Sequence, residues 1–416
     1  MGALSGGYNL CCFCRHRCLT WHIYPELLAA RLSDTIMAGM FIYVDVSAAV
    51  HHRAGLGRYG DSLVRELSGM MPDRLALFYN QERGVEPLNG LEHLPSRTVS
   101  LGYKPWRMAV WMGQLARLPF NRLVPGALLF HATEHLLMPL WGVPTVLTIH
   151  DLIPQLLPEH HKPLNRWYLN WTMPLYCRRA DHIIAVSEAT RRDLLATYHL
   201  PPEKVTVIHE AASARFRPQT ESAHERVRGM YGLPDNYLLY VGTIEPRKNL
   251  ERLLEAWTPL RRSGDCPPLV IAGKRGWLSD SFYAALEASR VREDIILTGY
   301  VQDADLPVIY SAATAFVWPS LYEGFGLPPL EAMACGTSVV CADVSSMPEV
   351  VGDAALLFDP LEVEAMRKTI RRLVMDRDLR EELRRRGLVQ AAKFSWSRAA
   401  RETLAVYSRL LAAHSA

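Results

Sequence analysis

Hydrophobic residues in this chain form short, nearly continuous runs that alternate with longer segments in which apolar positions recur every three or four residues. From Met40 onward this pattern predicts an α/β fold, with buried parallel strands joined by amphipathic helices. In the first half the predicted strands are FIYVDV (41–46), LALFYN (75–80), LLFHA (128–132), TVLTIH (145–150), HIIAVS (182–187) and VTVIHE (205–210). In the second half they are YLLYVG (237–242), PLVIAG (268–273), DIILTGY (294–300), AFVWPS (315–320), TSVVCA (337–342) and AALLFD (354–359).

The two series of strands are separated by AASARFRPQTES (211–222), which has neither a strand nor a helix period. A chain of 416 residues with 49% hydrophobic residues can bury two cores of ordinary size. We therefore predict two doubly wound, Rossmann-like domains, residues 37–215 and 216–394, that face each other across a cleft. Residues 395–416 are predicted to be an amphipathic helix that needs a surface to cover.

Composition narrows the classes of partner. The formal net charge of +3 is small for this length, so nucleic acid is excluded as the main partner. No run of about 18 apolar residues could cross a bilayer, since even the stretch 127–149 is interrupted by His131, Glu134 and His135. We expect a soluble protein that is at most peripheral to a membrane.

The first cysteines lie in a segment without a clear period, at Cys11, Cys12, Cys14 and Cys18. Their spacing matches none of the paired spacings of structural zinc, so a metal site is the disfavoured interpretation. Residues 1–36 are interpreted as an upstream extension whose removal leaves stability and activity unchanged. The remaining cysteines are scattered in apolar surroundings, which is typical of a reduced, cytoplasmic protein.

In open parallel sheets, ligands bind beyond the carboxyl ends of the strands. Segments that follow predicted strands at this edge are AAVHHRAGLGRYG (48–60), HDLIP (150–154), TIEPRKN (243–249) and LYEGFGLPPLEAMACGTSVV (321–340). We expect the functional residues in these segments.

The first of them contains Gly55-x-Gly57-x-x-Gly60, formally the dinucleotide fingerprint. The intervening SAAVHHRA argues against that motif, because its first glycine normally follows the strand directly. A glycine loop that contacts a ligand is favoured over NAD binding and over a plain turn, with the helix expected to begin at RYGDSLVREL.

Arg247 and Lys248 lie at a strand-to-helix turn, where two cations and a helix dipole suit a diphosphate. The competing interpretation is that both residues are solvated surface charges.

His150 and Asp151 end an apolar strand. The histidine is either a hydrogen-bond donor or proton shuttle, or the pair caps a turn.

Glu323 and Glu331 surround a turn rich in glycine and proline. We expect Glu323 on a loop and Glu331 within the first helical turn, with Pro329 near the first helical position. Two carboxylates that face one cleft can hold two polyols, such as a sugar ring and a ribose. A capping role could explain Glu331 but not Glu323.

Five stretches of the chain together resemble the family-four retaining glycosyltransferases of the GT-B fold. They are SLYEGFGLPPLEAMACGTSVV, SSMPEVVGDAALLFDP, VGTIEPRKNLERLLEAW, TGYVQDADLPVIYSAATAFVWPS and VSEATRRDLL. The resemblance extends from about Met40 to the end. It implies that the first domain binds the acceptor, the second binds a nucleotide sugar, and the terminal helix crosses back to the first domain.

The resemblance also implies roles for single residues. Glu323 would contact the donor sugar, Glu331 the ribose, and Lys248 with Arg247 the diphosphate, while His150 would be the cleft histidine. The expected catalytic residues are His150, Glu323, Lys248 and Arg247; the expected donor-binding residues are Gly57, Arg247, Lys248, Gly324, Phe325, Gly326, Leu327 and Glu331.

Two positions depart from the family. The residue after the glycine of the second domain's first strand is often arginine but here is Thr243, so Arg247 must supply much of the phosphate charge. The hinge segment VIHEAAS replaces the common Asn-Gly. His209 and Glu210 receive no assigned role.

We expect a metal-independent hexosyltransferase without a cofactor, since no Asp-x-Asp motif stands where a divalent ion would bind. The resemblance implies retention by front-face attack, with the departing phosphate accepting the acceptor's proton. GTIEPRKN resembles the mannosyltransferases of bacterial polysaccharide assembly, and this resemblance implies GDP-mannose as donor ahead of UDP-hexoses, and a glycan or lipid-linked acceptor. The alternative is a sugar-nucleotide epimerase of the same architecture, which turns over the nucleotide sugar alone.

The segment 103–125 interleaves basic residues with tryptophan, leucine and phenylalanine and contains no acidic residue. One interpretation is an amphipathic helix that lies at an anionic membrane surface, where each basic residue contributes about 1 kcal/mol to the binding free energy. The other is an ordinary domain helix whose tryptophans belong to the core. Both interpretations predict a cytoplasmic enzyme. In the first, the enzyme is also bound peripherally to the inner face of the membrane.

Overall fold

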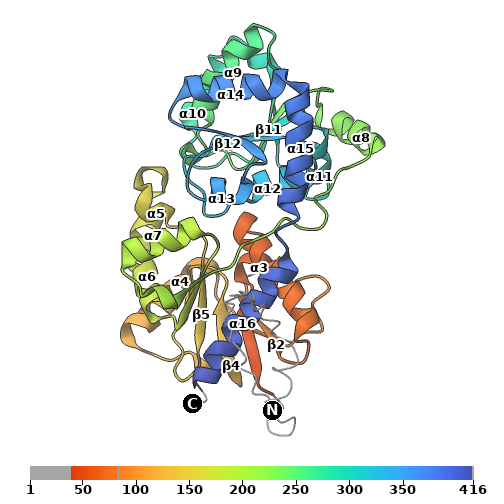
Figure 1. Ribbon diagram of the computed structural model, residues 1–416. Coiled ribbons are helices and arrows are strands. Elements are labelled where there is room, and N and C mark those ends of the chain that lie inside the picture. Colours follow the sequence, from red (N-terminus) through yellow and green to blue (C-terminus); the bar gives the residue numbers. More distant parts are fainter. Residues whose placement is uncertain (1–38, 83, 415–416) are drawn as a thin grey trace, which may run out of the picture. The chain divides into compact units, whose positions relative to one another are not determined.

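The computed structural model describes residues 39–82 and 84–414. The cysteine-rich segment 1–36, with its predicted extension and disfavoured metal site, lies outside the described residues. The described chain contains two parallel sheets with helices packed on them (Figure 1). The predicted α/β fold with two doubly wound domains is confirmed.

The first sheet has seven strands in the order β3-β2-β1-β4-β5-β6-β7, and their paired neighbours are parallel. The strands are β1 (Phe41–Asp45), β2 (Leu75–Asn80), β3 (Ser96–Val99), β4 (Ala127–Ala132), β5 (Thr145–Ile149), β6 (His182–Ala185) and β7 (Val205–Val207). Strand β3 was not predicted because it is an edge strand whose side chains are largely exposed, so it lacks an apolar pattern.

The second sheet has six strands in the order β10-β9-β8-β11-β12-β13, again with parallel pairs. They are β8 (Leu238–Val241), β9 (Leu269–Ala272), β10 (Ile295–Gly299), β11 (Ala315–Trp318), β12 (Val339–Ala342) and β13 (Ala355–Phe358). Each of them falls within a predicted run, because the buried inner strands have continuous hydrophobic sequence and the partly buried edge strands β10 and β13 are also rich in apolar residues.

The helices of the first half are α2 (Ser47–Val50), α3 (Ala54–Met70), α4 (Tyr103–Ala116), α5 (Ile153–Leu156), α6 (Pro163–Arg179) and α7 (Glu188–Tyr198). Those of the second half are α8 (Glu221–Tyr231), α9 (Leu250–Arg262), α10 (Asp280–Glu287), α11 (Leu306–Ala312), α12 (Leu327–Ala334), α13 (Met347–Val351), α14 (Val363–Met375), α15 (Arg377–Ala391) and α16 (Trp396–His414). Short 3-10 turns are η1 (Asn121–Leu123), η2 (Pro158–His160), η3 (Pro202–Lys204), η4 (Pro246–Lys248) and η5 (Arg292–Asp294).

Helix ends follow local chemistry. Ser187 caps α7, since its hydroxyl accepts a hydrogen bond from the amide of Thr190, and Glu188 lies at the positive end of the helix dipole. Helix α4 ends earlier than the predicted amphipathic segment 103–125. Arg117 takes a left-handed conformation with φ of 53° and Pro119 follows, so the helix stops at Ala116.

The last helix, α16, packs against α3 and β4 of the first half (Figure 1). The ring centroids of Trp396 and Tyr59 lie 5.7 Å apart, and the Tyr407 hydroxyl lies 2.6 Å from Nδ1 of His131. The apolar face of α16 is therefore buried on the first sheet's side. No helix among the described residues is long and apolar enough to cross a membrane.

Candidate active site

The turn after β8 is tied to the loop after β11. Asn249 takes a left-handed conformation with φ of 59°, and its side-chain amide donates to the carbonyls of Pro319 and Pro360 at 3.1 and 2.8 Å. The amide of Leu321 donates to the Arg247 carbonyl at 2.9 Å. Two segments more than seventy positions apart thus form one edge of the second sheet, where ligands bind in this architecture.

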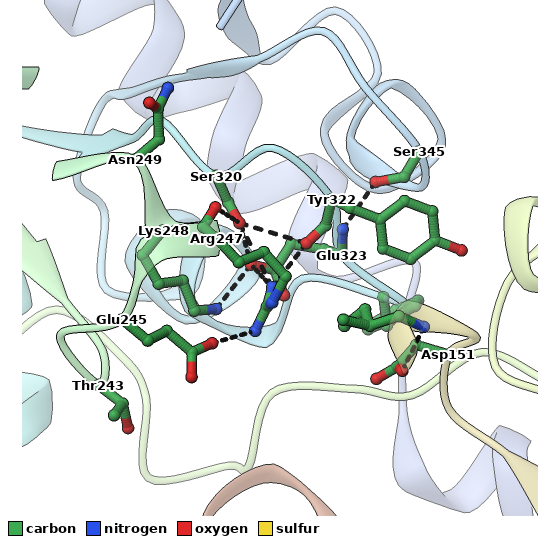
Figure 2. Close-up of polar contacts among 12 residues, drawn as sticks. Asp151, Thr243, Glu245, Arg247, Lys248, Asn249, Ser320, Tyr322, Glu323 and Ser345 are labelled. Carbon is green, nitrogen blue, oxygen red and sulfur yellow. Dashed lines mark hydrogen bonds and ion pairs between the residues drawn. The ribbon is translucent and has the colours of Figure 1, made fainter. Parts of the chain in front are cut away.

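Three donors converge on a single oxygen of Glu323 (Figure 2). Its Oε1 accepts from Nζ of Lys248 at 2.6 Å, from Nη1 of Arg247 at 2.8 Å and from the hydroxyl of Ser320 at 2.5 Å. The Glu323 residue is only 9% exposed. Charge-assisted bonds of this kind are strong when they are shielded from water.

The charges in this cluster offset one another. Burial alone would raise the pKa of Glu323, but the adjacent Arg247 and Lys248 outweigh it and hold the pKa below its usual range. Arg247 also donates to Oε1 of Glu245 at 2.7 Å. Burial and the charge of Arg247 lower the pKa of Lys248, whose ammonium group lies 4.3 Å from the ring centroid of Trp318. Two cations are thus held by two carboxylates at this edge of the second sheet.

The loop that carries Glu323 is fixed by two serines that precede α13. The Glu323 amide donates to Oγ of Ser345 at 2.9 Å, and the Ser346 hydroxyl donates to the carbonyls of Glu323 and Phe325 at 3.1 and 2.6 Å. Gly326 caps α12 with φ of 109°, a conformation that favours glycine. These contacts hold the carboxylate in a defined position.

The side chains of Phe325 and Leu327 belong to the core. The Phe325 ring lies 5.7 Å from that of Phe394 and 5.9 Å from that of His209, and Leu327 is buried as the first residue of α12. A donor could touch these two predicted binding residues only through their backbone.

Glu331 differs from the prediction in its position on the helix. It lies one residue beyond the first turn of α12, since Leu327 rather than Pro329 begins the helix. Its Oε1 accepts from Nη1 of Arg58 at 2.9 Å and its Oε2 from the Tyr310 hydroxyl at 3.0 Å. Burial raises its pKa, and Arg58 and Tyr310 offset part of that rise. The two glutamates of the motif therefore bind different partners.

His150 is held by two acceptors. Its Nδ1 lies 2.9 Å from Oε1 of Glu210, and its Nε2 lies 2.9 Å from the carbonyl of Thr133. Because both partners accept, both ring nitrogens must donate, which requires the charged imidazolium. Burial opposes that charge, but the bond to Glu210 and its charge raise the pKa above the usual value. Asp151 accepts from the Ile153 amide at 3.0 Å and so caps a turn.

The Glu323 loop also touches the end of β5. A Cβ on Gly324 would lie 1.8 Å from the carbonyl oxygen of His150. The hydroxyls of Ser187 and Thr190 donate to the Gly324 carbonyl at 2.6 and 3.2 Å. Only glycine permits this approach, which brings two of the predicted ligand edges together.

Comparisons with known proteins place this geometry in a family. The model of Glycosyl transferases group 1 matches residues 227–389, and that of Glycosyltransferase Family 4 matches residues 54–213. O-antigen chain mannosyltransferase B of Escherichia coli is 38% identical over 267 residues, which are 64% of this chain and 70% of that protein. The chain belongs to the group 1, family 4 glycosyltransferases.

Further relatives include a serotype-specific mannosyltransferase WbdA of Escherichia coli, 34% identical over 276 residues; the match covers 64% of this chain and 34% of that protein. Among solved structures, sucrose-phosphate synthase from Thermosynechococcus elongatus superposes with a TM-score of 0.73 at 20% identity, covering 90% of this chain and all of the other. The lipopolysaccharide glycosyltransferase WaaG gives 0.66 at 16% identity, covering 88% and 99%. These structures support the GT-B fold.

In this glycosyltransferase the predicted glycine loop is part of a helix. Helix α3 begins at Ala54, before all three glycines of the motif. A Cβ on Gly57 would lie 2.8 Å from the Ala48 carbonyl oxygen, so this glycine lets α3 pack closely on α2. The expectation of a loop is wrong, because the helical turn starts directly after Arg53.

Sequence reasoning missed several polar groups of the glycosyltransferase. Ser320 and Glu245 complete the cluster around Arg247, and both could have been found because they follow predicted strands. Glu134, which follows β4, is 2% exposed; its Oε2 accepts from Arg53 at 2.9 Å, and its Oε1 has no hydrogen-bond partner within 39–82 and 84–414. This oxygen is therefore a buried acceptor without a hydrogen-bond donor among these residues.

Among the same described residues, no group of three His, Cys, Asp or Glu side chains could hold a metal ion.

Proposed function

We propose that this glycosyltransferase moves a mannosyl residue from GDP-mannose to a hydroxyl group of a glycan or lipid-linked acceptor, with retention of anomeric configuration, in polysaccharide assembly. The names of its relatives support the sugar and the process, since they include O-antigen chain and serotype-specific mannosyltransferases. In this proposal the enzyme acts in the cytoplasm. No observation favours the epimerase alternative.

The observation that carries the proposal is the convergence of Arg247, Lys248 and Ser320 on Glu323. When the bond between the sugar's anomeric carbon and the phosphate oxygen breaks, negative charge develops on the leaving diphosphate. Arg247 and Lys248 stabilise that charge in the proposed reaction, and no metal ion is required.

Retention follows from attack on the face that the diphosphate leaves. The acceptor oxygen forms the new bond to the anomeric carbon, and its proton passes to the departing phosphate oxygen. Glu323 accepts three hydrogen bonds and has a lowered pKa, so it is a weak nucleophile and base. Its proposed role is to position the donor sugar.

Glu331 is the proposed partner of the donor ribose. Each carboxylate oxygen has two lone pairs, so Glu331 can accept from a hydroxyl group while it keeps Arg58 and Tyr310.

The first test is a thermal-shift screen of GDP-mannose, UDP-glucose and UDP-galactose with the purified enzyme. A donor at 100 times its Kd should stabilise the fold by about 2.7 kcal/mol. Proton NMR of the product then reports its anomeric configuration. The function is rejected if GDP-mannose is neither bound nor consumed in the presence of acceptor, and turnover of the nucleotide sugar alone to an epimer would support the epimerase.

Metal independence has its own test. Activity should persist in EDTA, because the proposed stabilisation of the diphosphate is provided by side chains. Loss of activity that Mg²⁺ or Mn²⁺ restores would contradict this part of the proposal while leaving the donor assignment intact.

A further inference from the structure

Large apolar side chains are exposed together on two neighbouring helices. On α4 and the residues after it they are Met108, Met112, Leu115 and Leu118; on α6 they are Leu164, Trp167 and Trp171. Leu164 is 81% exposed, and Met112 and Trp171 are each 63% exposed. Soluble monomers rarely expose large contiguous apolar patches, so a cluster of this kind indicates an interaction surface.

The two helices are joined directly. Trp111 and Trp167 meet edge to face with ring centroids 5.6 Å apart, and Nη1 of Arg107 donates to the side-chain oxygen of Asn165 at 3.0 Å. Residues 108, 112 and 115 share one face of α4, and residues 164, 167 and 171 share one face of α6, by the helical period. We call these exposed residues of the two helices the α4–α6 face.

Exposed basic residues outnumber exposed acidic ones around this face, which is flanked by Glu159 and Asp181. Neither 103–125 nor 160–180 contains an aspartate or glutamate. Exposed basic residues border the apolar side chains: Lys104 lies one turn before Met108, Arg117 follows the end of α4, Arg122 lies in η1, and Lys162 precedes α6. With these four exposed basic residues against two flanking carboxylates, the surface is complementary to a negatively charged partner.

The chemistry of the face distinguishes a membrane from a protein partner. Tryptophans are enriched at the interface between water and lipid, where lysine and arginine extend toward the headgroups. Lysine is depleted in protein interfaces, whose cores also lack a uniform charge. We infer that the α4–α6 face docks on an anionic lipid surface.

This surface differs from the one expected from residues 103–125 alone. Trp106 is in the core, and Arg107 lies against the rings of Tyr103 and Tyr168, so neither is available to lipid. The exposed tryptophans of α6, Trp167 and Trp171, are the aromatic residues available to lipid instead. The inference goes beyond the proposed function, because binding to lipid requires neither donor nor acceptor.

The experiment is flotation of the full chain with vesicles of phosphatidylcholine, alone or mixed with phosphatidylglycerol, without nucleotide sugar. We expect binding to the anionic vesicles only, and weaker binding as NaCl rises. Trp167→Ser with Trp171→Ser, and separately Arg117→Glu with Arg122→Glu, should each reduce the partition coefficient at least tenfold.

Matched controls distinguish an effect of the α4–α6 face from a general effect of lost surface hydrophobicity or changed net charge. Leu361→Ser with Met375→Ser removes exposed apolar groups elsewhere, and Arg372→Glu with Arg377→Glu makes the same change of charge on α14 and α15. Both controls should bind like the wild type. If the tryptophan variant fails to fold by circular dichroism, Met112→Ser with Leu164→Ser replaces it, because Trp167 is only 50% exposed and packs against Trp111.

Three outcomes overturn the inference. They are equal binding to neutral and anionic vesicles, wild-type binding by a folded variant of the α4–α6 face, and a wild-type dimer in sedimentation equilibrium that the tryptophan variant converts to monomer. The last would identify a second copy of the chain as the occupant. None of these results depends on sugar transfer.

Discussion

Glu323 and Lys248 are buried charges that depend on each other. Lys248 reaches Glu323 at 2.6 Å from a turn that also carries Arg247, and the indole ring of Trp318 lies beside its ammonium group. In the proposed donor complex, this ammonium group has to share or give up its bond to Glu323 when it contacts the diphosphate.

Lys248→Ala should weaken GDP-mannose binding about 10- to 100-fold, because a hydrogen bond to a charged group contributes roughly 1.5–3 kcal/mol. Isothermal titration calorimetry measures the change. Lys274→Ala is the matched control, since Lys274 is an exposed lysine after β9, and it should bind the donor normally. Unchanged affinity in the folded Lys248 variant would remove this residue from the donor site.

The His150 and Glu210 pair makes stability depend on pH. The folded-state pKa of His150 is raised above the usual value of about 6.5, so the pair's stabilisation is fully present below that pH. It is lost as the pH rises through the raised pKa.

Glu210→Gln should therefore destabilise the fold by on the order of 1 kcal/mol at pH 6 and by less at pH 9, measured by urea unfolding. The control is Glu221→Gln, which removes a largely exposed carboxylate beside His224 and should have little effect. An equal cost of the Glu210 change at both pH values would show that His150 is not held as a cation.

At the scale of elements, the start of α12 determines where the Glu323 loop ends. Gly326 has φ of 109°, and a Cβ there would lie 2.2 Å from the methyl group of the buried Met347. An L-residue at this position is strained in its backbone and crowded by its neighbour.

Gly326→Ala should lower the free energy of unfolding by about 1–3 kcal/mol, with the larger part from the backbone. Gly299→Ala is the comparison, because Gly299 has φ of 68° with no atom within 4 Å of the added Cβ. Its cost should be smaller. Denaturant titration of both variants measures the difference, and a lower cost at Gly326 would contradict the conformation described for α12.

At the scale of the whole molecule, Arg58 on α3 and Glu331 on α12 join segments 273 positions apart. The Glu331 carboxylate is buried, whereas the Arg58 side chain is 31% exposed. Loss of the cation would leave a buried carboxylate with Tyr310 as its remaining hydrogen-bond donor.

Arg58→Met should lower the free energy of unfolding by about 1–3 kcal/mol at pH 7. Breaking a fully buried ion pair costs more, because Arg58 is partly hydrated here. The pKa of Glu331 is already raised and would rise further, so its protonation relieves the penalty as the pH falls through that value. Unfolding at pH 7 and pH 4.5 tests this. Arg398→Met, which breaks an exposed pair with Glu402, should show little cost at either pH.

The sequence by itself determined the sheets, the ligand edges and the family. Continuous apolar runs identify the buried strands, and the predicted runs match every strand except β3, with Ala127 at the start of β4 lying one residue outside its run. Residues 243–249 and 321–340 follow such strands, so their place at the carboxyl edge was predictable. These features are local, because they depend on side-chain period, turn residues and order along the chain.

Only the tertiary structure decided which side chains meet. Glu331 pairs with Arg58, His150 with Glu210, and the tryptophans of α6 lie beside α4. The glycine motif also proved helical, since Gly57 serves the contact between α2 and α3. Such contacts join residues far apart in the chain, and they are set by how helices pack on sheets, which no local period encodes.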